Sequence, residues 1–512
     1  MTVSIYKSIV KIIIFSIGSK ILGFFREILI AYKFGASTES DCFFVATVAT
    51  GLFASFFIQS LNTSLIPVLA DIKKNETTQK SNVIISNIIT VVISLSIILT
   101  ISGAIFSPII IKMLAVGFSK EKIDLSINLM RIGIPVIIFS SFVGIFRSIL
   151  QSNYKFNEFA LSYYPYNFVY IIYLIFLSSI FGIHGLMVAS VLAVFSQVFY
   201  QYFQIRKYKF KYHFSFDLSD KYLKRIFYMI IPILGTVAAG DINRIIDKTL
   251  ASQLVEGSIS ALNYSYILNN TVLEIFIAPI SVVLFPIISN SIDSEKEKIK
   301  VTVMKAYEAI IALTIPATLF LMIFSKEIIT IVFQRGSFDY RATVLTSDAM
   351  RYYSLGLMAS SIRILTERLY YAKNDTRTPM FNSIISIGLN IFLNIILISS
   401  MQIKGLALAT SLSTFISTYF LLRKINKNST FFDDKVIYKF IVKITMLSLC
   451  IMLVLRLIYV LINPITTISS VTIIIIILIF GVTLYITFGG LLRIPFFKEI
   501  IRFIFAKITS KR

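Results

Sequence analysis

Long apolar runs, separated by short polar segments, follow one another along the chain. Residues 82–106 (NVIISNIITVVISLSIILTISGAIF) and 471–488 (VTIIIIILIFGVTLYITF) are each long enough to cross the roughly 30 Å of hydrocarbon in a bilayer. Some connections are very short, as in FGIHG at 181–185 and LVEGS at 254–258. The pattern predicts about fourteen transmembrane helices, and hence an all-α polytopic membrane protein.

Composition agrees with this class, because 56% of the 512 residues are hydrophobic, 15% are charged and the mean hydropathy is +0.83. Soluble domains need a more polar exterior than that. In a soluble chain the net charge of +23 would suggest a nucleic-acid partner. Here the basic residues lie mainly in the loops between apolar runs, so we expect no nucleic-acid binding.

The basic loops also predict an orientation. An even number of spans places both termini on one side of the membrane. Lysine and arginine gather in the segments on that side, among them 71–80, 206–225 and 423–435. Because cytoplasmic loops carry such an excess, we expect both termini to be cytoplasmic.

An internal repeat divides the chain. Segment 182–207 resembles segment 402–424, with Gly185 and Gly405 at corresponding positions. Repeats of about six helices share one orientation, which predicts two lobes around a cavity, related by an axis along the membrane normal. The expected parts are an N-terminal lobe (1–215), a C-terminal lobe (216–428), and two extra helices with a basic cytoplasmic tail (429–512).

Two equivalent lobes around a cavity are typical of a transporter. The sequence has no nucleotide-binding loop, selectivity-filter motif, zinc-protease motif or nucleophile elbow. Polytopic glycosyltransferases carry carboxylates or metal ligands on sizeable loops, and no loop here has that length. We therefore expect a transporter that is not an enzyme.

Charged side chains occur inside several predicted spans, although charge at membrane depth is costly and marks a functional site by default. The first span, within GSKILGFFREILIAYKFGASTESDCFFVAT, contains Lys20, Arg26 and Glu27. Arg244 and Arg363 lie in later spans. These arginines can bind an anionic substrate, or they can pair with acids within the membrane. The candidate acids are Asp241, Glu274 and Glu367.

The stretch GFFREILIAYKFGASTESDCFFVA resembles the helix 1–2 signature of the MurJ/MviN lipid II flippases, in the multidrug/oligosaccharidyl-lipid/polysaccharide exporter superfamily. ASQLVEGSISALNYSY, FQRGSF and YSLGL…YYAKNDTRTPM continue the likeness in order through both lobes. The resemblance implies transport of undecaprenyl-pyrophosphate-linked peptidoglycan precursor from the inner to the outer leaflet of the bacterial inner membrane. It also implies that the two extra helices form a groove for the lipid tail.

The resemblance implies roles for individual residues. Arg26 corresponds to the family's cavity arginine on helix 1, Lys20 to a second basic position, Glu27 to the neighbouring acid and Asp41 to the acid that opens helix 2. A pyrophosphate must lose water to cross, and guanidinium groups offer bidentate, permanently charged replacements. The alternative for Arg26 is an ion pair with Glu27 that holds helices together. Adjacent helical residues point about 100° apart, however, and need not pair.

Other positions depart from the family. Its helix 2 has an arginine pair followed by a glutamate, where this sequence has Phe53, Ala54 and Ile58. A family arginine on helix 8 corresponds to Ile267. Among the charges in other spans, Arg363 is the best placed to compensate, because it lies near the middle of its helix. The missing arginines favour another lipid-linked oligosaccharide, such as a capsule or O-antigen unit, as the alternative substrate.

A coupling ion is the one cofactor that the resemblance suggests. Asp247, Asn390, Asn394, Thr410 and the backbone carbonyl of Leu406 correspond to a sodium site of the family. Oxygen ligands are what a hard cation such as sodium requires. The alternative is that the asparagines hydrogen-bond between packed helices, a common use of asparagine in membranes.

We therefore expect a lipid II flippase of peptidoglycan synthesis that works by alternating access. The expected partners are the lipid-linked glycan, membrane lipids and the cell-wall synthesis machinery, and the transporter itself is expected to be a monomer. A multidrug exporter is a weaker alternative, because its cavity would be rich in acids. A cell-wall scaffold that transports nothing would need neither the repeat nor the intramembrane charges.

Overall fold

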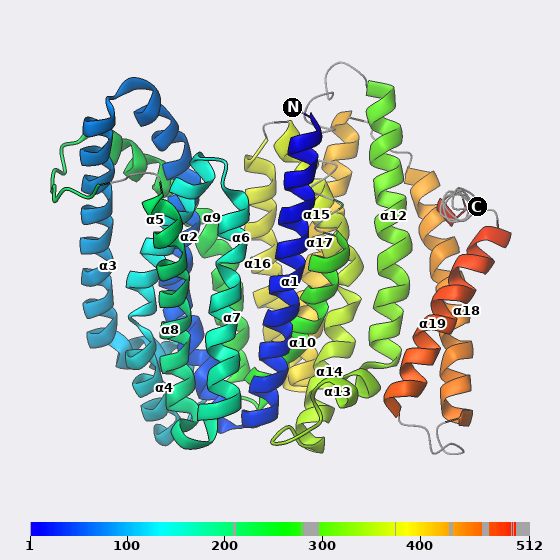
Figure 1. Ribbon diagram of the computed structural model, residues 1–512. Coiled ribbons are helices and arrows are strands. Elements are labelled where there is room, and N and C mark those ends of the chain that lie inside the picture. The colour runs from blue at the N-terminus through cyan, green and yellow to red at the C-terminus, as the bar shows by residue number, and fades with distance from the viewer. Residues whose placement is uncertain are drawn as a thin grey trace, which may run out of the picture. The chain divides into compact units, whose positions relative to one another are not determined.

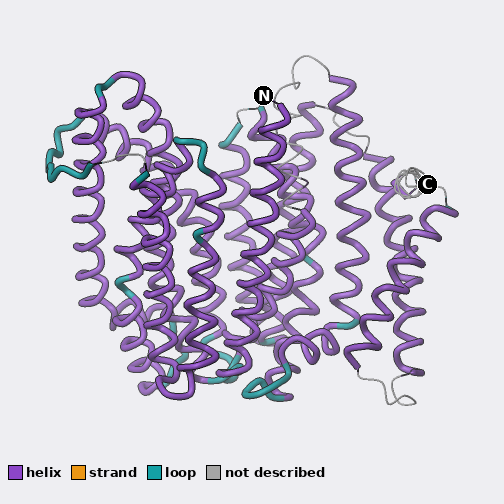
Figure 2. The backbone as a smooth tube through the Cα atoms, viewed as in Figure 1, coloured by secondary structure: helices purple, strands orange, loops and turns teal. Residues whose placement is uncertain are grey.

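The structure is a computed structural model that describes residues 2–207, 211–277, 280, 296–373, 375–429, 434–462, 470–492, 494, 496 and 497. Within these residues the chain forms helices joined by turns and loops, and no strand occurs (Figure 2). Nine of the described helical stretches are long and apolar enough to cross a membrane. The prediction of an all-α polytopic membrane protein is confirmed, and the count of about fourteen spans stays a prediction.

Contacts divide the chain into two compact units, of which the first comprises Met1–Asn263 and Arg335–Asp339. Its helices (Figure 1) are α1 (Thr2–Phe34), α2 (Thr38–Asn75), α3 (Thr78–Leu114), α4 (Lys120–Gly133), α5 (Val136–Ser152), α6 (Phe156–Leu161), α7 (Tyr163–Ile172), the π-helix η1 (Tyr173–Leu177), α8 (Ser178–Arg206) and α9 (Lys221–Ala251). α2 is the central helix of this unit, since it packs against α3, α4, α5 and α9.

Serine residues cap the start of α2, and a glycine of α5 allows a close contact further along it. The helix begins with a capping box, in which the side chains of Ser37 and Ser40 accept hydrogen bonds from each other's backbone N–H groups. Further along, α5 approaches α2 at Gly144, where a β-carbon would stand 3.0 Å from the carbonyl oxygen of Phe57. A larger residue at this position would force the two helices apart.

The second unit comprises Tyr264–Gln334 and Tyr340–Arg512. Its helices are α10 (Ser258–Val272, which begins in the first unit), η2 (Leu273–Ile277), α12 (Lys296–Ile323), α13 (Ser325–Phe333), α14 (Tyr340–Leu355), α15 (Leu357–Ala372), α16 (Arg377–Met401), α17 (Ile403–Ser429), α18 (Asp434–Ile462) and α19 (Ser470–Leu491). Its apolar core joins α12, α15, α18 and α19. α18 and α19, the helices expected outside the repeat, thus attach to this unit, with α18 packed against α12.

The two short connections predicted from the sequence differ in form. At 254–258 the chain passes from α9 to α10, and Gly257 adopts a φ of +84°. At 181–185 the chain remains within α8, but Gly182 has φ +54° and ψ −147°, which breaks the helix at a single residue. Glycine adopts that conformation without the steric cost that a β-carbon would bring.

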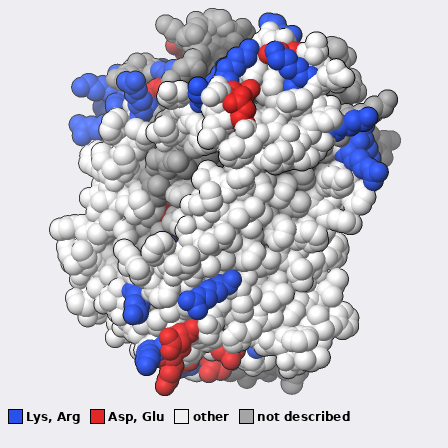
Figure 3. Space-filling model, turned by 90° about the vertical axis from the view of Figure 1, so that its left-hand side faces the viewer, with Lys and Arg blue, Asp and Glu red and all other residues white. Residues whose placement is uncertain are grey.

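The face shown in Figure 3 has its charged side chains mostly near the upper and lower edges, with a wide band of mostly uncharged side chains between. Such a band is what the hydrocarbon zone of a bilayer requires. It supports the view that the helices cross the membrane.

The predicted lobes (1–215 and 216–428) and the extra part (429–512) rest on the sequence repeat. The compact units are defined by contacts within the chain, so they do not test the repeat, and the division into lobes stays a prediction. The basic tail predicted at 498–512 lies outside the described residues.

Candidate functional site

The first candidate site surrounds Arg26 on α1. Its Nη2 donates to Glu27 Oε1 at 2.6 Å, and its Nη1 donates to Asn167 Oδ1 at 3.3 Å. The guanidinium carbon also lies 5.4 and 5.0 Å from the ring centroids of Tyr166 and Tyr170. Aromatic faces stabilise a desolvated guanidinium. α1 and α7 together therefore hold Arg26 in one orientation.

α7 supplies these partners from the sequence YYPYNFVYII, which places two tyrosines one turn apart beside Arg26. Asn167 is 4% exposed, and its amide nitrogen donates to the backbone carbonyls of Ser19 and Tyr163. These two bonds fix the amide so that its oxygen faces Arg26. Sequence reasoning missed Asn167, because one amide within an aromatic run gives no periodic signal.

The Arg26 site retains hydrogen-bonding capacity. The side chains of Arg26 and Glu27 are 19% and 11% exposed. Arg26 Nε and Glu27 Oε2 are buried, and neither has a hydrogen-bond partner among the described residues. A guanidinium has five N–H donors, so donors remain for phosphate oxygens.

The ion pair between Arg26 and Glu27 that the sequence left as an alternative is present. The two side chains leave α1 in different directions, but the arginine side chain is long enough for its Nη2 to lie 2.6 Å from Glu27 Oε1. Both residues belong to α1, so this pair does not join two helices. The link to α7 comes from the amide and the aromatic rings.

Asp41 lies near the start of α2 and is 3% exposed. Its Oδ1 accepts hydrogen bonds from the Ser260 backbone N–H at 2.8 Å and from Ser260 Oγ at 2.6 Å. Its Oδ2 accepts from the Gly257 backbone N–H at 2.8 Å. The carboxylate therefore caps the N-terminus of α10 from a neighbouring helix, where negative charge is favourable. Its predicted contact with substrate stays a prediction.

The remaining charged residues predicted in the first unit are less enclosed. Lys20 is half-buried on α1, Arg244 is exposed on α9, and Asp247 is half-buried further along α9. Asp241 accepts a 2.6 Å hydrogen bond from Ser55 Oγ on α2.

Lys248 is a charged residue that sequence reasoning missed. Its ammonium group donates to the Phe44 backbone carbonyl at 3.2 Å and lies 5.4 Å from the centroid of the Phe44 ring. The available signal was its position directly after Asp247, within a predicted span. α2 and α9 are therefore linked by a cation as well as by apolar packing.

Arg363 belongs to the second unit, on α15. Its Nε donates to Glu367 Oε1 at 2.8 Å and its Nη2 to Ser383 Oγ at 2.8 Å. Its Nη1 lies 3.5 Å from the hydroxyls of Ser386 and Ser417. These bonds tie α15 to α16 and α17. They fit the ion-pair alternative, and the predicted contact of Arg363 with substrate stays a prediction.

Four of the five predicted sodium ligands lie together in the second unit. Asn394 Nδ2 donates to Asn390 Oδ1 at 2.9 Å, Asn390 Nδ2 donates to Thr410 Oγ1 at 3.2 Å, and Thr410 Oγ1 donates to the Leu406 carbonyl at 3.1 Å. The two asparagines are 1% and 0% exposed. This chain of bonds joins α16 to α17. The fifth predicted ligand, Asp247, belongs to the first unit.

The donor set of this network is chemically suited to sodium, because amide, hydroxyl and carbonyl oxygens are all hard ligands. The described part of the chain contains no group of three or more His, Cys, Asp and Glu side chains that could hold a metal ion. Because the ligands that are present offer neutral oxygens, the network suits an alkali cation.

The positions where the family has charges are apolar here and take part in packing. On α2, Ala54 is 6% exposed, and Phe53 and Ile58 are half-buried. Ile58 lies at the close approach of α2 to Gly144. Ile267 is half-buried on α10.

Comparison with known proteins decides the family. A family model described as "Lipid II flippase MurJ" matches residues 30–484. This chain belongs to that family. A probable lipid II flippase MurJ of Buchnera aphidicola subsp. Baizongia pistaciae is 30% identical over 455 residues, which cover 86% of this chain and 87% of the relative.

Solved structures agree with this membership. The structure "Lipid II flippase MurJ, inward closed conformation" matches with a TM-score of 0.80 and 25% identity, and it covers 95% of this chain and 99% of that chain. An inward-facing multidrug resistance MATE family transporter of the MOP superfamily matches with a TM-score of 0.66 over 81% of this chain and 95% of that chain. Its 14% identity shows the fold alone. The predicted resemblance is confirmed, and the chain is a multi-pass membrane protein of a transporter family.

Proposed function

We propose that this chain carries lipid II, the undecaprenyl-pyrophosphate-linked peptidoglycan precursor, from the cytoplasmic to the outer leaflet of the bacterial inner membrane. The observation that carries the proposal is a family match over residues 30–484 that includes most of the described spans. The chain acts as a monomeric transporter without enzymatic activity. Both termini lie in the cytoplasm, beside the machinery of cell-wall synthesis.

In this proposal Arg26 meets the pyrophosphate. Its guanidinium is oriented by Glu27 and Asn167 and flanked by two tyrosine rings, yet its buried Nε has no hydrogen-bond partner among the described residues. A pre-oriented guanidinium replaces water around phosphate oxygens at a lower entropic cost than a mobile one. The two lobes then alternate access around the bound headgroup.

The lipid tail stays in contact with apolar helices during transport. α18 and α19 present exposed apolar side chains, such as Leu453 (58%), Leu457 (60%) and Ile479 (62%). Exposing such apolar side chains to water would be unfavourable, whereas the acyl chains of a bilayer are apolar as well. We assign these two helices to the undecaprenyl chain, as the family resemblance implies.

Sodium is proposed as the coupling ion. Its proposed ligands within the second unit are Asn390, Asn394, Thr410 and the Leu406 carbonyl, and the sodium gradient would drive the conformational cycle. Thr410→Val removes one oxygen ligand and keeps the side-chain shape. We expect sodium, but not potassium, to raise the melting temperature of the wild type and to leave that of Thr410→Val unchanged. Equal sodium responses of the two proteins would contradict this assignment.

Complementation tests the proposed substrate. A bacterium depleted of its own lipid II flippase would express the wild type, Arg26→Ala, or Arg225→Ala, the last changing an exposed arginine that pairs with Asp71 at the surface. We expect the wild type and Arg225→Ala to restore growth and outer-leaflet lipid II, and Arg26→Ala to restore neither at equal membrane expression.

A second candidate substrate is another lipid-linked oligosaccharide. The observation that favours it is the presence of Phe53 and Ile267 where the family has arginine. In the same depleted strain, a wild-type protein that is inserted and folded but restores neither growth nor outer-leaflet lipid II would support this candidate. Rescue by the wild type would exclude it as the main activity.

A further inference from the structure

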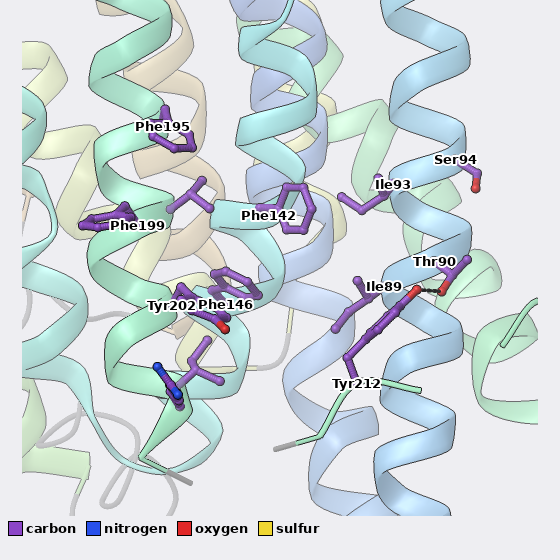
Figure 4. A pocket seen from close by; sticks show the side chains of 13 residues that line it. Ile89, Thr90, Ile93, Ser94, Phe142, Phe146, Phe195, Phe199, Tyr202 and Tyr212 are labelled. Atoms are coloured by element: carbon purple, nitrogen blue, oxygen red, sulfur yellow. Dashed lines mark hydrogen bonds between the residues drawn. The ribbon is translucent and has the colours of Figure 1, made fainter. Parts of the chain in front are cut away.

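A groove in the first unit is lined by residues of α3, α5 and α8, and none of the residues assigned above to the substrate or to sodium lines it. Phe195, Phe199 and Tyr202 in its lining are exposed, as expected of a surface that faces lipid. Its volume is about 560 Å³, within the range of ligand sites. α3 and α8 each pack against α5, which forms the floor with Phe142 and Phe146 (Figure 4). The lining is almost wholly apolar and aromatic, so any ligand that fills it must be apolar too.

The α8 wall has the dimensions of one membrane leaflet. Phe195, Phe199, Tyr202 and Arg206 follow at helical spacing and line the same groove. Eleven residues of helix rise about 16 Å. Half of a hydrocarbon core of roughly 30 Å is about 15 Å. The groove is therefore long enough to span one leaflet, and it ends at the cation Arg206.

Hydrogen bonds fix the residues at the surface end of the groove. Tyr212 OH and Thr90 Oγ1 form a 2.7 Å hydrogen bond at its α3 wall (Figure 4). The following segment is fixed to α3, since the His213 backbone N–H donates to Ser86 Oγ at 3.1 Å. Asn87 exchanges two hydrogen bonds with the backbone of Asp217, at 2.7 and 2.8 Å. Polar groups therefore stand where a lipid headgroup would begin.

This end of the groove is positively charged. Arg206 is exposed and makes no hydrogen bond or ion pair with the described residues, and the exposed Lys207 and Lys211 follow it. The nearby acids are engaged with backbone N–H groups: Asp217 accepts from Ser219, and Asp220 accepts from the first turn of α9. An excess of lysine and arginine at this end also predicts that it faces the cytoplasm, where anionic lipids are attracted by basic clusters.

We propose that this groove binds one anionic phospholipid of the phosphatidylglycerol type, with an acyl chain along α8 and the phosphate at Arg206. A helix about 10 Å across and as long as the α8 wall would need roughly twice the groove's volume of about 560 Å³. An undecaprenyl chain has several times the carbon atoms of one acyl chain and does not fit a cavity of about 560 Å³. An acyl chain with a phosphate headgroup matches the length, the apolar lining and the charged end.

The absence of tryptophan from the sequence allows a direct test. Phe199→Trp places a single tryptophan in the groove, and Phe392→Trp places one on an exposed position of α16 as a control. Each protein would be reconstituted in nanodiscs of phosphatidylcholine containing brominated phosphatidylglycerol or, at the same fraction, brominated phosphatidylcholine. Bromine quenches a tryptophan only on close contact.

We expect brominated phosphatidylglycerol to reach Trp in Phe199→Trp with about fivefold preference over brominated phosphatidylcholine, the effect of one basic residue on an anionic lipid. In Phe392→Trp we expect no preference. Adding Arg206→Gln should abolish the preference, whereas Arg423→Gln, an exposed arginine at the corresponding repeat position on α17, should leave it intact.

Three results would overturn the proposal. They are equal quenching by both lipids, a preference that survives Arg206→Gln, and relief of quenching by undecaprenyl phosphate at low mole fraction, which would assign the groove to the substrate tail. Native mass spectrometry of the unmodified protein provides a measurement without tryptophan. It should show retained phosphatidylglycerol on the wild type and a loss of several-fold in Arg206→Gln.

Discussion

Arg26 and Arg363 resemble each other in two respects: each lies within the apolar part of its unit, and each pairs with a glutamate. Their side chains are 19% and 20% exposed, and the distances to Glu27 and Glu367 are 2.6 and 2.8 Å. By burial and pairing alone, the two sites are equivalent. What distinguishes them is the use of the remaining N–H groups.

Arg363 directs its other nitrogens to serine hydroxyls on α16 and α17. Arg26 instead lies against two tyrosine rings and one amide, and its Nε has no hydrogen-bond partner in the described part of the chain. An arginine whose three nitrogens are all engaged holds helices together. An arginine that is oriented but retains donors is prepared for an anionic ligand.

The largest effect is expected at Arg363. Arg363→Ala removes hydrogen bonds to three helices and leaves Glu367 without its cation, so we expect the free energy of unfolding to fall by about 3 kcal/mol. Thermal unfolding of the purified protein measures this loss, with the exposed Arg423→Ala as the control. Unchanged stability together with lost transport would instead make Arg363 a substrate residue.

A smaller effect is expected from the group that orients Arg26. Asn167→Ala leaves the guanidinium bound to Glu27 but free to swing, and we expect the flipping rate per folded molecule to fall about tenfold, as for one hydrogen bond to a charged group. Asn153→Ala, which changes an amide at the end of α5 that binds Lys73, is the control. A rate within twofold of wild type would show that Asn167 does not position Arg26.

The smallest effect concerns an ion pair outside the membrane. Hydrogen bonds from Lys80 and Tyr222 lower the pKa of Glu76, at the end of α2, from 4.5 to about 2. Its contribution to stability is therefore present above pH 4.5 and is lost as the pH falls toward 2. Unfolding measured from pH 6 to pH 2 should show a slightly shallower decline in Glu76→Gln. Identical profiles would mean that solvent screens this pair fully.

The sequence predicted much of the fold, because a long apolar run is a reliable sign of a membrane helix. It predicted the short connection at 254–258 and placed Arg26 within the first helix and Asp41 near the start of the second, as observed. It did not show that Gly182 breaks a helix at one residue, since backbone geometry depends on what packs around it. It also missed Asn167, because the value of that amide comes from its contact with a residue 141 positions earlier.

Arg26 is expected to contact the substrate, whereas Arg363 is expected to support the fold. The direct test is the flipping rate of fluorescent lipid II in proteoliposomes, normalised to reconstituted protein, for the wild type, Arg26→Lys and Arg363→Lys. Lysine keeps the charge but loses the bidentate fork, so the account predicts a loss of about tenfold for Arg26→Lys and a rate near wild type for Arg363→Lys. A wild-type rate in Arg26→Lys, with a large loss in Arg363→Lys, would contradict it.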